Sequence, residues 1–146
     1  MKLRLDLLEH LTDEDILDAL GDSALGLITS FHYSEDHKSA ENKAYTEAYA
    51  KAYPKDRPNF MSVGGYDGMH LIAEVLKKTN GDTDADKFVA AAKGMKWESP
   101  RGPISIDPAT RDIVQTIYIR KVERVAGKLQ NVEFDHVADF KDPGKE

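Results

Sequence analysis

The sequence predicts an α/β fold in which a helix-rich portion is followed by a β-hairpin portion. Apolar residues recur at helical spacing through much of the first hundred residues, between glycines and prolines. After Gly94 the pattern becomes β-rich, and two apolar runs flank the turn signal Ala126-Gly127. We therefore expect one domain over residues 1–146, with an α/β portion over about 12–93 and a β-rich return segment over about 95–138.

The bulk composition bounds the class of protein. The 146 residues carry a net charge of −6, with 40% hydrophobic and 32% charged residues, as expected for a single soluble domain. Nucleic acid is excluded as the main partner, because it requires a concentrated basic surface. The chain has no cysteine, which excludes disulfides, thiol catalysis and zinc–thiolate sites.

The sequence contains no apolar run near the ~20 residues that span a bilayer. Its amino terminus, MKLRLDLLEHL, alternates charge with leucine and offers neither a clean apolar core nor a small-residue cleavage site. We therefore expect no secretion signal in the chain as written, which would make it cytoplasmic as expressed.

The first elements follow from capping and patterning. Thr12 is the expected N-cap of a first helix that ends at Gly21, with acidic residues 13–15 in its first turn. Residues 25–31 indicate a short buried strand, and the polar residues 32–38 indicate a loop.

Ser39 is the expected cap of the next helix, which ends at Pro54. One face of that helix carries Tyr45, Ala48, Tyr49 and Ala52. Tyrosines at 45, 49 and 53 form an aromatic stripe, which is usually core or interface.

A third helix is expected after Pro58, and its start is open from propensity alone. Glycines at 64, 65 and 68 each cost helix stability, so the helix begins near Tyr66 or its glycines permit close packing. A fourth helix is expected between Thr83, as its cap, and Gly94.

The remaining residues predict strands. Residues 104–106 indicate a short strand before the turn at Asp107-Pro108, and Ile113–Val125 is long enough for a full strand. Its partner is expected over Leu129–Phe134, and the tail after Asp139 is expected to fray.

Two segments invite a chemical interpretation. The stretch FHYSEDH, residues 31–37, could hold a metal, could be a solvated loop, or could contact a ligand where a buried strand ends. The glycine-rich run at 64–68 lacks the spacing and the lysine of a phosphate loop, so close helix packing is favoured. We find no nucleophile–base motif, and an enzyme is disfavoured.

The stretch GMKWESPRGPISID, residues 94–107, could be an anion loop because Arg101 lies between Pro100 and Gly102. It has too few convergent donors for that function, so we interpret it as a connector. Trp97 is expected to pack the junction, and Arg101 to form a structural salt bridge or to cap a carbonyl.

Three runs, residues 21–54, 57–84 and 87–123, resemble the carboxyl-terminal part of periplasmic solute-binding proteins of ABC importers. The resemblance is to the leucine/isoleucine/valine-binding type and covers about Leu11 to Phe134. It implies part of a bilobed receptor, with a parallel sheet in each lobe, that binds a solute in its cleft without chemistry. It also favours one continuous helix from about Pro58 to Lys78.

The resemblance further implies a small-molecule ligand, such as a branched-chain amino acid or a related organic solute, an ABC permease as partner, and a periplasmic location. It implies no catalytic residue, no metal and no cofactor. Because family members are at least twice this length, it implies a fragment in which ligand binding is weak or absent. Phe31, His32 and Tyr33 are the expected ligand contacts, because they would lie beside the cleft.

A second hypothesis is a stand-alone interaction or structural domain that has lost ligand binding. A fragment of a bilobed receptor would expose apolar faces, and such faces drive association. We therefore expect a homo-oligomer or a domain-swapped dimer. A stable ligand-free oligomer through the face of Tyr45, Tyr49 and Tyr53 would favour this hypothesis.

Overall fold

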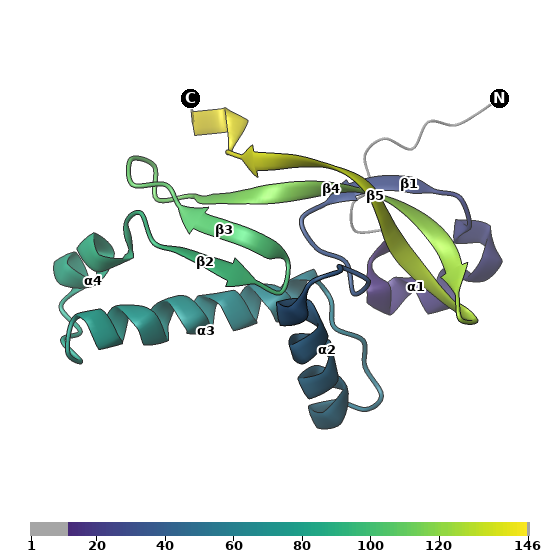
Figure 1. Ribbon diagram of the computed structural model, residues 1–146, viewed down its shortest axis with the longest axis horizontal. Coiled ribbons are helices and arrows are strands. Elements are labelled where there is room, and N and C mark those ends of the chain that lie inside the picture. Colours follow the sequence, from purple (N-terminus) through teal and green to yellow (C-terminus); the bar gives the residue numbers. More distant parts are fainter. Residues whose placement is uncertain (1–11, 146) are drawn as a thin grey trace.

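The structure, a computed structural model, describes residues 12–145 (Figure 1). Its helices are α1 (Glu14–Leu20), the short 3₁₀ helix η2 (Gly21–Ala24), α2 (Ala40–Ala52), α3 (Phe60–Lys78), α4 (Ala85–Ala92) and the terminal 3₁₀ turn η3 (Pro143–Lys145). Its strands are β1 (Ile28–Phe31), β2 (Lys96–Ser99), β3 (Gly102–Ile106), β4 (Ile113–Val125) and β5 (Lys128–Phe140). The mixed α/β class is the one that the sequence predicts.

The long strand β4 organises the sheet. It pairs with β5 along nearly its whole length, with β1 across Tyr118–Lys121, and with β3 at its start. All of these described pairings are antiparallel, whereas the family resemblance implied parallel sheets. Strand β1 comes from the helix-rich portion, so it joins the two portions through the sheet.

Two predicted helix caps are wrong by one residue. Asp13, not Thr12, occupies the N-cap position of α1, and Thr12 is buried one residue earlier. Asp84, not Thr83, caps α4, because its side chain accepts a hydrogen bond from the Lys87 backbone N–H. In both places two adjacent residues are of types that can cap a helix, so the sequence alone does not select between them.

The four predicted strands are present in the predicted order but differ in extent, and the structure adds a fifth. Strand β1 begins at Ile28, because Gly26 has a φ of +81° and residues 25–26 form a turn. Strand β4 has the predicted bounds, and β5 runs six residues beyond the predicted Phe134, as far as Phe140. The connector at residues 94–107 contains a strand that the sequence analysis missed, β2, whose hairpin with β3 turns at residues 100–101.

Helix α3 is continuous over 19 residues, as the family resemblance predicted. Its start is fixed by a capping box, in which the Asn59 side chain accepts from the Ser62 N–H and the Ser62 hydroxyl accepts from the Asn59 N–H. The expectation that its glycines permit close packing is wrong for the described residues. No atom outside the helix's own backbone lies within 4 Å of a Cβ built at Gly64, Gly65 or Gly68.

The hydrophobic core is divided into two small clusters. One joins α1 to the β4–β5 hairpin, and its members are Leu17, Ala24, Val122 and Leu129. The other lies between the loop after β1 and helices α2 and α3, and its members are Tyr33, Tyr45 and Val63. Of the predicted aromatic stripe, Tyr45 therefore lies in the core, while Tyr53 is exposed. Among residues 12–145, no helix is long and apolar enough to cross a membrane.

Candidate functional site

The loop over residues 32–38, here called the crossing loop, connects β1 to α2 and contacts several elements of the fold. Asn42, in the first turn of α2, fixes its shape from one side. The Asn42 amide donates to the backbone oxygens of Glu35 and His37 at 2.9 Å each, and its oxygen accepts from the Tyr33 hydroxyl. Ser39 caps α2, as predicted, by accepting from the Asn42 N–H at 3.0 Å.

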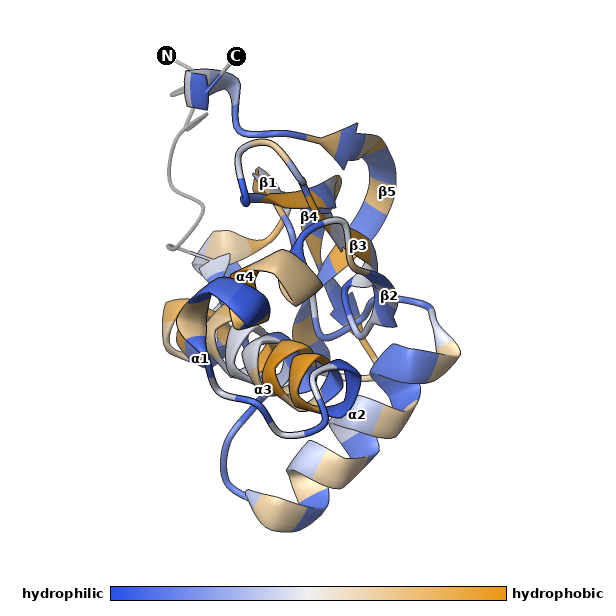
Figure 2. Cartoon of the chain, turned by 90° about the vertical axis from the view of Figure 1, so that its left-hand side faces the viewer, coloured by the Kyte–Doolittle hydropathy of each residue, from blue (hydrophilic) through white to orange (hydrophobic). Residues whose placement is uncertain are grey.

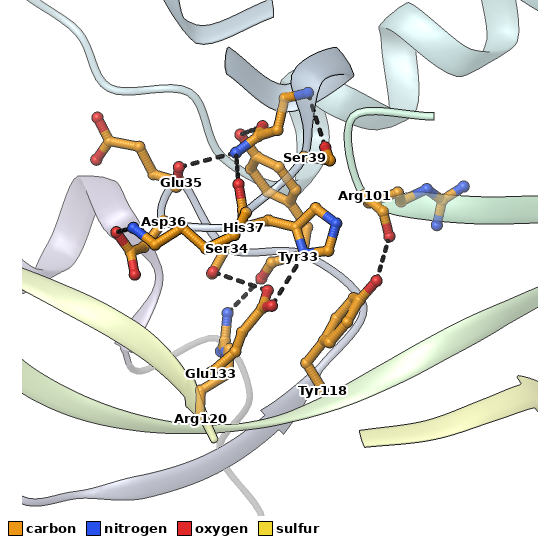
Figure 3. A network of polar contacts seen from close by, with 12 residues as sticks. Tyr33, Ser34, Glu35, Asp36, His37, Ser39, Arg101, Tyr118, Arg120 and Glu133 are labelled. Carbon is orange, nitrogen blue, oxygen red and sulfur yellow. Dashed lines mark hydrogen bonds and ion pairs between the residues drawn. The ribbon is translucent and has the colours of Figure 1, made fainter. Parts of the chain in front are cut away.

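Strand β5 fixes the crossing loop from the other side through one carboxylate (Figure 3). Glu133 accepts from the Ser34 hydroxyl at 3.1 Å and from His37 Nδ1 at 2.9 Å, one on each carboxylate oxygen. Glu133 lies about a hundred residues along the chain from both, so only the tertiary fold brings the three together.

The side chains of Ser34, His37 and Glu133 resemble a catalytic set in composition but differ from one in geometry. A nucleophilic serine needs its hydroxyl bonded to the base that takes its proton. Here the Ser34 hydroxyl donates to the carboxylate instead, and the imidazole occupies the other carboxylate oxygen. The arrangement therefore holds the loop in place rather than activating a nucleophile.

Arg120 of β4 binds the start of the crossing loop through hydrogen bonds. Its fully buried guanidinium donates to the Tyr33 backbone oxygen and, at 3.2 Å, to the Thr29 hydroxyl. The same guanidinium lies over the Phe31 ring, 5.1 Å from its centroid, within the range of a cation–π interaction. The end of β1 is thus fixed by a buried charge.

The three predicted ligand contacts lie in different environments. The rings of Phe31 and His32 are 4.4 Å apart and both lie near Phe60, at 5.2 and 6.2 Å. Tyr33 lies apart from this aromatic group, because its fully buried ring packs near Tyr45. Phe31 is also buried, so His32 is the most accessible of the three.

Two surface depressions flank this region. One, of about 510 Å³, is lined by the crossing loop and the first turns of α2, from Glu35 to Thr46. The other, of about 810 Å³, lies between α2 and α3, and four of its nine lining residues are tyrosines. Neither is lined by Phe31, His32 or Tyr33. Among the described residues, no group of three or more histidines and carboxylates could hold a metal ion.

The turn between β2 and β3 is tied to α3 by a buried ion pair. Arg101 Nε donates to Asp67 Oδ2 at 2.7 Å, and Trp97 Nε1 donates to the other oxygen of Asp67 at 3.3 Å. The prediction of a structural salt bridge for Arg101 is confirmed. Sequence patterns gave no sign that Asp67, within the glycine-rich run, is its partner.

Tyr118 of β4 joins this turn to the crossing loop. Its hydroxyl donates to the Arg101 backbone oxygen at 2.9 Å, and its ring lies 4.8 Å from that of His37. Burial, followed by the nearby Glu133 carboxylate, raises the pKa of Tyr118 to about 12, so the hydroxyl keeps its proton. Gly102 makes this approach possible, because a Cβ there would overlap the Tyr118 hydroxyl.

We expect Gly102→Ala to lower the free energy of unfolding by about 2 kcal/mol. The backbone at Gly102 has a φ of +91°, which strains any residue with a side chain, and the new methyl would also displace Tyr118. Urea unfolding followed by Trp97 fluorescence measures the change.

Gly127→Ala is the matched control, because Gly127 has a φ of +87° but no atom near its Cβ position. We expect it to cost about 1 kcal/mol from backbone strain alone. Equal losses for the two variants would show that the Tyr118 approach to Gly102 is unimportant.

Comparison with known proteins assigns this fold to a class. A sequence model described as a periplasmic binding protein matches residues 3–128, and the chain belongs to this family. The chain is 47% identical over 136 residues to the Leu/Ile/Val-binding protein homolog 6 of Brucella abortus, a match that covers 92% of this chain. It spans about a third, 35%, of that relative's length.

Solved structures agree with this assignment. A solute-binding protein of an ABC transporter from Rhodopseudomonas palustris BisB5, in complex with 3,4-dihydroxybenzoic acid, is 60% identical with a TM-score of 0.90. The match covers 93% of this chain and 37% of that one. A second such protein, from Rhodopseudomonas palustris HaA2 in complex with p-hydroxybenzoic acid, is 43% identical with a TM-score of 0.88, covering 92% and 37%.

Proposed function

We propose that this chain forms part of the binding component of an ABC importer and that the solute is a small aromatic carboxylic acid. The observation that carries the proposal is the 60% identity to a solute-binding protein solved with 3,4-dihydroxybenzoic acid. Two further relatives, at 43% and 41% identity, were solved with 4-hydroxybenzoic acid or its anion. The Leu/Ile/Val-binding protein homolog 6, at 47% identity, favours an aliphatic amino acid instead, and the experiment below compares the two classes. A solved leucine-, isoleucine- and valine-binding neighbour is only 17% identical, so that likeness supports the fold alone.

The aromatic group at the end of β1 supports the same class of ligand. Phe31, His32 and Phe60 present three ring systems within 6.2 Å of one another, beside the Arg120 guanidinium. Rings at such distances accept another ring by edge or offset stacking. We propose His32 as the direct contact, with Phe31 forming the wall behind it and the buried Tyr33 holding the loop in position.

We expect the chain by itself to bind the solute weakly. Because it spans about a third of its curated relatives, the other contacts of the cleft would come from elsewhere. Binding sites usually enclose most of the ligand's surface, so a site that encloses less of it binds more weakly. We therefore expect affinity in the millimolar range, and a periplasmic site of action as for the family.

Chemical-shift mapping tests the proposed ligand class. In ¹H–¹⁵N spectra, millimolar 4-hydroxybenzoate is expected to shift the amide signals of residues 31–33, whereas leucine at the same concentration is expected to leave them unchanged. His32→Ala should reduce the 4-hydroxybenzoate shifts severalfold, because it removes the accessible ring.

His136→Ala, an exposed histidine on β5, is the matched control and should keep the wild-type response. Shifts with leucine but not with 4-hydroxybenzoate would contradict the ligand class. The absence of shifts with both would favour the second hypothesis, a domain without ligand binding.

A further inference from the structure

The start of α1 places two neighbouring carboxyl groups inside the protein. Asp13 and Glu14 are only 2% and 0% exposed, and carboxylates are rarely buried to this extent unless they are paired. One oxygen of each, Asp13 Oδ1 and Glu14 Oε2, has no hydrogen-bond donor among residues 12–145. The two side chains instead hydrogen-bond to each other. Ionised carboxylates only accept hydrogen bonds, so this contact requires a proton on one of the two groups.

The charges around this pair do not balance two negative charges. The titratable and charged groups on the elements that surround it are Tyr33, Glu35, His37, Arg57, Arg120 and Glu133. Arg57 is bonded to Glu35 at 2.6 Å, and His37 to Glu133 at 2.9 Å. Arg120 is the cation whose charge acts on Glu14. One guanidinium does not offset two buried carboxylates, so the pair is stable with one proton and one negative charge.

Glu14 also joins α1 to two other parts of the fold. Its Oε1 accepts from the Glu35 backbone N–H at 3.2 Å and from the Asn131 amide at 3.1 Å. The same amide donates to the Thr12 backbone oxygen at 2.6 Å. Asn131 is buried on β5, a strand along which hydrophilic and hydrophobic residues intermix (Figure 2). A single carboxyl group thus connects the start of α1 to the crossing loop and to β5.

We propose that Asp13 and Glu14 share one proton and form a latch between α1 and the crossing loop that opens when this proton leaves. With the proton in place, the two carboxyls are hydrogen-bonded and Glu14 binds Glu35 and Asn131. Loss of the proton to solvent leaves two negative charges in contact, where both repulsion and desolvation are unfavourable. The start of α1 then separates from the loop and from β5, and water hydrates the second charge.

The latch acts on α1 more than on the crossing loop. The loop keeps its hydrogen bonds to Asn42 and Arg57, which involve no proton of the pair. We therefore expect the first turn of α1 to move while the loop keeps most of its shape. The inference goes beyond the proposed function, because it holds whether or not the chain binds a solute.

Carboxyl ¹³C signals of the whole chain test the shared proton. We expect the signals of Asp13 and Glu14 to change together near pH 7, because burial raises the pKa of Glu14 to about 7 and the pair loses one proton in common. Asp13→Asn should lower the midpoint of Glu14 by about one pH unit, since it removes the neighbouring negative charge. An Asp13 signal that stays constant while Glu14 titrates, or an unchanged midpoint in Asp13→Asn, would overturn the shared proton.

Amide hydrogen exchange tests the opening. Protection factors, corrected for the intrinsic pH dependence of exchange, are measured at pH 6 and pH 8.5. The Glu35 and Leu17 N–H groups report on the latch, because they donate to Glu14 Oε1 and to the Asp13 backbone oxygen. The Ile106 N–H of β3, which donates to the Met95 oxygen, is the internal reference. We expect protection at the latch to fall about tenfold more than at Ile106, and equal losses at all three sites would contradict a local opening.

Glu14→Gln should keep the latch closed at both pH values. The glutamine amide can donate to Asp13 while its oxygen accepts from Glu35, so the hydrogen bonds are preserved without a titrating proton. We expect the extra loss of protection at Glu35 to disappear in this variant. Asp15→Asn, which changes an exposed carboxyl on the same helix, should retain the wild-type loss. A loss that persists in Glu14→Gln would overturn the latch, whether or not 4-hydroxybenzoate binds to the chain.

Discussion

Asp67→Ala is expected to lower the free energy of unfolding by about 3–5 kcal/mol, the largest single effect that we expect. Asp67 and Arg101 are both nearly inaccessible, with 5% and 7% of their side chains exposed. Removing the carboxylate leaves the Arg101 charge buried without its partner at 2.7 Å, and it also removes the acceptor of Trp97 Nε1. Urea unfolding of the two proteins gives the difference, and the emission of Trp97, the chain's one tryptophan, reports on the junction directly.

Glu74→Ala is the matched control on the same helix. Glu74 pairs with Lys77 at 2.5 Å, but that pair is largely exposed. Exposed pairs contribute about 0–1 kcal/mol, so this variant should unfold close to the wild type. If the two variants lose similar stability, the connector between β2 and β3 is not anchored by its buried ion pair.

Stability is expected to fall as the pH rises through about 7, and Glu14→Gln should abolish much of that fall. Glu14 is fully buried beside Asp13, and its Oε1 accepts from Asn131 and from the Glu35 backbone N–H. Burial, reinforced by the hydrogen bond with Asp13, raises its pKa from 4.5 to about 7, although Arg120 and Asn131 pull it down.

The direction of this pH dependence follows from the linkage between the ionisation of Glu14 and folding. Because the folded pKa exceeds the unfolded value, the group's full contribution to stability is present below pH 4.5 and is lost as the pH rises through 7. The shift corresponds to about 3 kcal/mol. Urea unfolding at pH 5 and pH 8 should therefore show a large loss in the wild type and a smaller one in Glu14→Gln.

Asp15→Asn serves as the comparison, since Asp15 belongs to the same helical turn but is exposed. Its pH dependence should follow the wild type. Parallel profiles for wild type and Glu14→Gln would mean that Glu14 is already ionised in the folded chain at pH 5.

Several of these interactions converge on the crossing loop. Its residues bond to α2 through Asn42, to β5 through Glu133, to α1 through Glu14, and to the α2–α3 connection through Arg57, whose Nε donates to Glu35 at 2.7 Å. Contacts from four elements restrict the conformations that the loop can adopt. It can therefore present the end of β1 in a fixed geometry, as a preorganised binding site requires.

Local chemistry allowed much of the fold to be predicted. The bounds of β4 follow from its β-branched run and the adjacent turn, and Ser39 caps α2 because a hydroxyl before a helix accepts a free N–H. The continuous α3 is different. Its three glycines contradict propensity, and only the family resemblance predicted the helix correctly.

The candidate site could be predicted only in part. The sequence drew attention to the crossing loop because polar residues follow a strand that was predicted to be buried. It could not show that Tyr33 turns into the core while His32 stays accessible. It gave no sign of Glu133, because a glutamate on a long strand is ordinary. Asn42 had a local signal, as a polar residue three positions after a capping serine, which the sequence analysis did not use.

By itself, then, the sequence determined the α/β class, the order of the helices and the β4–β5 hairpin, because these depend on spacing and capping within short stretches of the chain. The family came instead from the resemblance of three longer runs. Only the tertiary structure decided the partners across the chain: Arg101 with Asp67, His37 with Glu133, and Arg120 with the Tyr33 carbonyl. It also decided that the glycine face of α3 stands open. The physical reason is that the partner of a buried charge depends on which helix or strand packs against it. A local sequence pattern does not contain that information.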